Sequence, residues 1–81
     1  MPRLPRAPGK EHLRAFLRAG WVLDRIEGSH HILIKYGCDA ELSIPVHQGK
    51  IVSLGTLKGL IGDADLTNEE YIEAKKKILN R

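Results

Sequence analysis

The sequence lacks most of the features on which larger or cofactor-dependent proteins rely. Its single cysteine, Cys38, excludes an internal disulfide and a cysteine-based zinc cluster. No apolar run approaches the ~20 residues of a membrane-spanning helix, and the Pro- and Arg-rich start has no apolar segment of the signal-peptide kind. Glycine-rich phosphate loops, nucleophile elbows and His-Glu-X-X-His motifs are also missing. We therefore expect a soluble, cytoplasmic domain without a cofactor.

Length and charge set further bounds. Eighty-one residues allow one domain, because domains usually have roughly 50–250 residues. Thirteen Lys and Arg against 10 Asp and Glu give a formal charge of +3. Six of the basic residues lie within positions 1–25: Arg3, Arg6, Lys10, Arg14, Arg18 and Arg25. A basic end attracts polyanions such as nucleic acids, but this charge is also ordinary for a small domain. Nucleic-acid binding and ordinary solvated surface charge therefore both stay open as interpretations.

The hydrophobic pattern predicts one helix, three strands and two more helices. Prolines at every third position make residues 1–8 a flexible, extended arm ahead of a single domain at 9–81. The expected elements are a helix over 9–19 that Gly20 closes, strands at 21–27, 31–36 and 41–46, a helix with Thr56 as N-cap, and a helix after the capping box Thr67–Glu70. Short connections imply an antiparallel meander, hence an α+β fold with one sheet face open.

The four histidines are the only plausible source of reactive chemistry. If residue 36 pairs with residue 41, His30 falls opposite His47 at one end of the sheet. His30 and His31 point to opposite faces and cannot readily share a metal ion, so we expect no metal site. His30 alternates with the more apolar residues of its strand, which predicts a buried His30 and an exposed His31 if that face is the covered one.

These histidines have two possible interpretations. Histidine titrates near neutral pH and suits general acid/base chemistry, and RNA supplies its own nucleophile, the 2′-hydroxyl. One well-placed histidine can therefore cleave RNA where cations hold the phosphate. The alternative is that they are ordinary surface histidines. Lone carboxylates such as Asp24 and Glu27 show no recognisable pairing in the sequence.

A series of short motifs adds to this reading. In order they are Gly20-Trp21, Arg25, Gly28-Ser29-His30, Ile44-Pro45-Val46-His47, Gly49, Gly55-Thr56-Leu57 and Ala64. Together they resemble the HicA (YcfA-like) family of bacterial and archaeal mRNA-interferase toxins, over roughly residues 10 to 70. The resemblance implies a double-stranded-RNA-binding-domain-like α-β-β-β-α fold, here with an extra C-terminal helix. Asp65 departs from the pattern, since the family usually has glycine there.

The resemblance also implies a function. It implies metal-independent endoribonuclease action on mRNA, with His30 as general acid or base, and neutralisation by a HicB-type antitoxin that covers the site. Ser29 and His47 are expected to support His30. Arg25, Lys50 and Lys58 are the expected RNA contacts, chosen because they lie close to the motif in sequence. The alternatives are a non-catalytic RNA-binding module of the same fold and a protein that only occupies its antitoxin.

Overall fold

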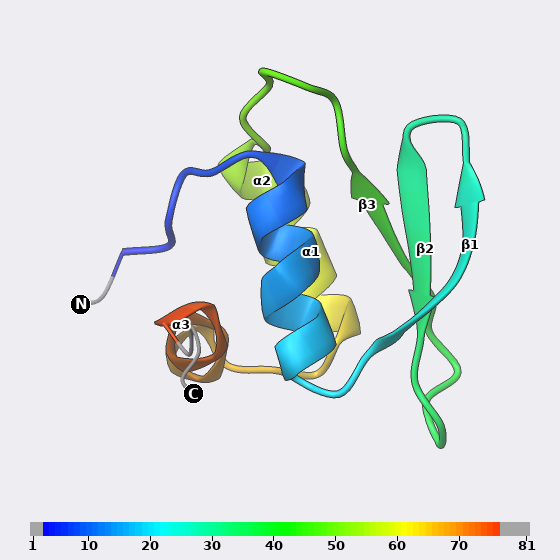
Figure 1. Cartoon of the computed structure of the whole chain (residues 1–81). Helices are drawn as coiled ribbons and strands as arrows, with labels where there is room; N and C mark the ends of the chain where they lie inside the picture. The colour runs from blue at the N-terminus through cyan, green and yellow to red at the C-terminus, as the bar shows by residue number, and fades with distance from the viewer. Residues whose placement is uncertain (1–2, 77–81) are drawn as a thin grey trace.

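The computed structural model describes residues 3–76, which form three helices and one three-stranded sheet. The elements are α1 (Gly9–Arg18), β1 (Val22–Glu27), β2 (His30–Ile34), β3 (Leu42–Pro45), α2 (Leu54–Asp63) and α3 (Asn68–Lys76). All three helices lie on one side of the sheet, and β1 is the strand farthest from them (Figure 1). The predicted α+β fold is therefore confirmed. Residues 1, 2 and 77–81, which the expected arm and last helix include, lie outside the described residues.

The sheet is an antiparallel meander in the order β1-β2-β3, as the short connections predicted. Its register differs from the expected one, because His30 lies opposite Pro45 and not opposite His47. The ladder between β2 and β3 already ends at the pair Leu33 and Leu42, so the connecting loop is longer than predicted. An offset of two residues keeps every side chain on its face, and His30 stays at the same end of the sheet.

A β-bulge in β1 decides which side chains reach the open face of the sheet. Leu23 pairs with Leu33 and Arg25 pairs with Ile32, so Asp24 is an extra residue in the ladder. Without it, simple alternation would place Leu23 and Arg25 on the same face. With it, Arg25 lies on the open face, across from Ile32. The sequence pattern gave no sign of this bulge.

The alternation argument for the adjacent histidines was wrong. His31 is half-buried on the helix-covered face, on the same side as the fully buried Leu33. His30 is exposed on the open face. The expectation failed because both neighbours, Ile32 and Leu33, are buried, so the apolar residues of β2 do not mark the covered face.

The core lies between the helices and the sheet. It contains Ala15, Phe16, Trp21, Leu33, Leu42, Ile44, Val52, Leu57, Leu60, Ile61, Ala64 and Tyr71. The alternation of Leu42 and Ile44 in the third strand is confirmed, since both side chains are fully buried. Within residues 3–76, no helix is long and apolar enough to cross a membrane.

The start of the chain packs closely against the end of β3. Pro8 has an extended backbone conformation, and Ala7 before it is buried, with its carbonyl accepting a hydrogen bond from the Val52 amide at 3.0 Å. At Gly9, a Cβ atom would lie 1.9 Å from the carbonyl oxygen of Pro45. Only glycine allows this approach, which brings the first turn of α1 to the edge strand.

The two remaining helices begin with side-chain caps. Ser53, and not Thr56, is the N-cap of α2, because its Oγ accepts a hydrogen bond from the Thr56 amide at 3.2 Å. The predicted position was therefore three residues too late. The capping box before α3 is confirmed, with reciprocal hydrogen bonds between Thr67 and Glu70 at 2.8 and 3.0 Å.

Candidate functional site

The hairpin between β1 and β2 places His30 at one end of the open face. Gly28 has a φ of +60°, and Glu27 pairs with His30, so Gly28-Ser29 forms a two-residue turn. Positive φ at the first turn position alone is typical of type II′ hairpins, and glycine accepts it without strain. His30 therefore leaves the turn as the first residue of β2, with an exposed side chain.

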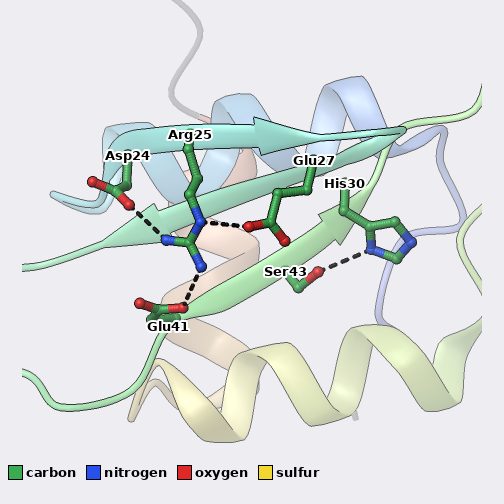
Figure 2. Close-up of polar contacts among 6 residues, drawn as sticks. All are labelled: Asp24, Arg25, Glu27, His30, Glu41 and Ser43. Atoms are coloured by element: carbon green, nitrogen blue, oxygen red, sulfur yellow. Dashed lines mark hydrogen bonds and ion pairs between the residues drawn. The ribbon is translucent and has the colours of Figure 1, made fainter.

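A serine on the neighbouring strand orients the His30 ring. Nδ1 of His30 and Oγ of Ser43 are joined by a hydrogen bond of 2.9 Å across the open face (Figure 2). This bond fixes one edge of the imidazole and leaves Nε2 on the other edge. A hydroxyl both donates and accepts, so Ser43 can serve either tautomer of His30.

His47 forms the second part of the site. The Val46 amide donates a hydrogen bond of 2.8 Å to the Ser29 carbonyl, which continues the β3 pairing beside the hairpin turn. His47 follows directly, and its Nε2 lies 3.1 Å from Ser29 Oγ. The ring centroids of His47 and His30 are 6.4 Å apart in an edge-to-face arrangement. The predicted proximity of the two histidines is therefore confirmed, despite the different register.

Arg25 is surrounded by carboxylates. Its guanidinium group forms ion pairs with Asp24 at 2.6 Å, Glu27 at 2.7 Å and Glu41 at 3.2 Å (Figure 2). Hydrogen bonds first to Glu27, then to Asp24 and Glu41, raise the pKa of Arg25 above its usual value. The excess of negative charge in this cluster disfavours contact between Arg25 and an RNA phosphate. The cluster also corrects the expectation that Asp24 and Glu27 are unpaired.

The two lysines expected at the RNA differ in their positions. Lys50 and His47 line the same small cavity of about 170 Å³ in front of the first turn of α2. Lys58 is exposed on α2. The structure thus places Lys50 beside His47.

A larger groove lies on the other side of His47. Its volume is about 580 Å³, and its lining includes Lys10 and Leu13 of α1, His31 of β2 and residues 46–49 of the following loop. We call it the α1–loop groove. His47 takes part both in the pair with His30 and in the wall of this groove.

Ser43 and Glu41 are the site residues that the sequence argument missed. Both lie on the polar face of the third predicted strand, and His30 is on the strand next to it. The alternation within that strand would have indicated Ser43, had the ladder register been known. For metals, the described residues contain no group of three or more His, Cys, Asp or Glu side chains placed to hold an ion.

The chain was compared with curated proteins and with models of protein families. A search of curated proteins found no matching relative. The family model described as HicA toxin of bacterial toxin-antitoxin matches residues 9–66, which is well over half of the chain. The matched range includes the hairpin, both histidines of the pair and the whole of α2. The chain therefore belongs to the HicA toxin family of bacterial toxin–antitoxin systems.

Proposed function

We propose that this toxin is an endoribonuclease that cleaves mRNA, with His30 as its general acid/base and without a metal ion. Membership of the family points to nuclease activity in general. The observation that carries the finer proposal is the state of His30: its ring is exposed, Ser43 holds Nδ1, and Nε2 is left for a substrate. Proton transfer by such a positioned group contributes about 10²–10⁴-fold to a rate.

The reaction begins from the tautomer of His30 that carries its proton on Nδ1. When Nδ1–H donates to Ser43 Oγ, Nε2 carries a lone pair and takes the proton of the substrate 2′-hydroxyl. The 2′-oxygen forms a bond to phosphorus, and the bond from phosphorus to the 5′-oxygen breaks. The departing 5′-oxygen takes up a proton from water, and Nε2–H afterwards returns its proton to the solvent. The products are a 2′,3′-cyclic phosphate and a 5′-hydroxyl.

Ser29 and His47 have supporting roles in this scheme. The bond from His47 Nε2 to Ser29 Oγ ties the β3–α2 loop to the hairpin turn that carries His30. Lys50 shares a cavity with His47 and supplies positive charge for the phosphate. Lys58 would contact a more distant phosphate, and at Arg25 the surrounding carboxylates weaken the attraction for RNA.

A toxin of this kind has an antitoxin partner, and we propose one of the HicB type that covers His30. The exposed edge strand β1 supports this proposal. Its side chains Val22, Leu23 and Ile26 are 59%, 42% and 55% exposed, and Ile26 pairs with His31 next to the site. Apolar side chains on an uncovered edge strand are typical of protein interaction surfaces.

The experiment that tests the chemistry compares two versions of one mRNA fragment. The first is all ribose, and the second has a single 2′-deoxy nucleotide on the 5′ side of the cleaved bond. We expect cleavage of the first only, with a cyclic phosphate on the product. Cleavage of the deoxy version, or a product that ends in a plain 3′-hydroxyl, would show that water is the nucleophile and would refute the scheme. Binding of both versions without any cleavage would favour the alternative, a non-catalytic RNA-binding module.

A further inference from the structure

The surroundings of His30 differ sharply in charge from one side to the other. On the open face of the sheet, Asp24, Glu27 and Glu41 surround the single guanidinium of Arg25. Three carboxylates against one cation make this side of His30 net negative. A phosphate chain that crossed it would be repelled, because like charges near one another cost free energy at low ionic strength.

The other side of His30 offers one lysine and several hydrogen-bonding groups. There Ser29 Oγ lies 3.1 Å from His47 Nε2, and His47 forms one wall of the α1–loop groove. Lys10 is exposed at the groove, and His31 and Gln48 add polar groups that can bond to a base or a ribose. Leu13 and Val46 supply apolar surface for the flat face of a base.

The groove is large enough for one nucleotide of a single RNA strand. Its volume of about 580 Å³ lies within the roughly 300–1,000 Å³ of ordinary ligand sites. His31 lines the groove and is half-buried, and its Nδ1 is a buried atom with no hydrogen-bond partner among the residues that the structure describes. This ring is therefore not committed to a structural hydrogen bond through Nδ1.

From this polarity we infer that the RNA strand runs from His30 over His47 into the α1–loop groove, and not across the open face of the sheet. Lys10 contacts a phosphate next to the scissile one, and the side chains of His31 and Gln48 hold the attached nucleoside. The inference rests on the proposed ribonuclease function and adds the path of the substrate to it. The groove, and not the sheet face, then selects the nucleotide beside the cleaved bond.

Binding is tested first, without any need for cleavage. A short single-stranded RNA with 2′-O-methyl groups throughout is titrated into the isotope-labelled protein, and the amide signals are followed by NMR. We expect the largest shifts at Lys10, His31 and Gln48. Shifts at Asp24 and Glu41 with none in the groove would overturn the inference.

Charge reversal at one lysine provides the matched comparison. Lys10→Glu lies at the groove, whereas Lys76→Glu changes the net charge equally at the exposed end of α3. For Lys10→Glu we expect at least a tenfold weaker Kd and a salt slope lower by roughly 0.7, the value for one phosphate of a single strand. Lys76→Glu should keep the wild-type salt slope. Equal effects of the two variants would overturn the proposed path.

These outcomes separate the inference from the function on which it rests. If the wild type cleaves mRNA but Lys10→Glu and Lys76→Glu have the same KM, the ribonuclease assignment stands and the path is wrong. If no mRNA is cleaved but the groove signals shift with RNA, the groove site stands and the ribonuclease assignment is wrong. A KM increase in Lys10→Glu with an unchanged kcat is the expected result, since a contact to a phosphate that does not react contributes uniform binding.

Discussion

Replacing Tyr71 by phenylalanine tests whether α3 belongs to the folded domain. Tyr71 is fully buried, and its hydroxyl forms a hydrogen bond with Nδ1 of His12 on α1, which is also fully buried. The Tyr71 ring additionally packs on Phe16, with ring centroids 4.9 Å apart. Tyr71→Phe keeps this packing and removes only the hydroxyl, so it isolates one buried polar contact between helices that are far apart in sequence.

The expected decrease in the free energy of unfolding follows from the loss of the Tyr71 hydroxyl as the hydrogen-bond partner of His12. A buried polar atom without a hydrogen bond costs about 1–3 kcal/mol, and His12 Nδ1 would become such an atom. In a domain of this size each 1 kcal/mol lowers the Tm by about 4–8 °C, so a loss of about 2 kcal/mol predicts a decrease of roughly 8–16 °C. Thermal unfolding followed by circular dichroism measures it.

The chain contains its own control for this substitution. Tyr36, the other tyrosine, is fully exposed, so Tyr36→Phe should leave the Tm unchanged. If Tyr71→Phe behaved like Tyr36→Phe, the packing of α3 over His12 would be wrong. This matters because α3 begins after residue 66, where the match to the HicA toxin model ends.

His12 also gives the stability a defined pH dependence. Burial, with a smaller contribution from Lys75, lowers the pKa of His12 below its ordinary value of 6.5, while Glu11 opposes the shift. The unfolded chain therefore binds this proton more readily than the folded chain. The free energy of unfolding contributed by His12 is fully present above about pH 6.5 and is lost as the pH falls through the lower pKa of the folded state. The Lys75 ion pair lowers the pKa of Glu11, whose contribution is lost only at more acidic pH, below 4.5.

Four further substitutions test other parts of the structure. Gly9→Ala should destabilise the fold by about 1–3 kcal/mol, since the new Cβ would meet the Pro45 carbonyl. Gly59→Ala has open space at its Cβ and should stabilise α2 by about 0.5–1 kcal/mol. If denaturant unfolding gave the same sign for both changes, the close approach at Gly9 would be contradicted. Asp65 has a φ of +60°, so Asp65→Val should cost about 1–2 kcal/mol in the same assay, and an unchanged midpoint would argue against this backbone conformation. Ser43→Ala should lower the kcat of RNA cleavage roughly fivefold, the value of one hydrogen bond of about 1 kcal/mol, with KM unchanged; an increase in KM alone would assign this serine to substrate binding instead of to His30.

The sequence was most informative where local chemistry decides the structure. The capping box at Thr67 and Glu70, the glycine that ends α1 and the alternation in β3 each depend on a few neighbouring residues, and all three are present. The departure at Asp65 is also local. The family usually has glycine there, and the structure shows a positive φ that glycine adopts freely.

Features that depend on pairing between distant residues could not be predicted. The bulge at Asp24 moves Arg25 onto the open face, and the resulting carboxylate cluster involves Glu41 from the far side of β2. The bond from His12 to Tyr71 joins residues 59 positions apart. His30 and His47 lie close together as predicted, although the predicted register was wrong, because an error of two residues leaves a side chain on the same face.

The site itself was predicted through its histidines but not through their surroundings. A histidine after a tight turn is visible in the sequence, and so is a histidine at the end of the next strand. Ser43, which orients His30, and the carboxylates around Arg25 become recognisable only once the ladder register is known. This is why the negative side of the candidate site, and with it the proposed path of the RNA, had no counterpart in the sequence argument.

The central claim is that His30 cleaves RNA by acid/base chemistry without a metal ion. Its most direct test is single-turnover cleavage of an mRNA fragment in EDTA by the wild type and by His30→Ala. We expect the wild type to cleave at its full rate in EDTA and His30→Ala to lose about 10²–10⁴-fold, the range for a general acid/base. Undiminished cleavage by His30→Ala, or loss of wild-type activity on chelation, would contradict the account.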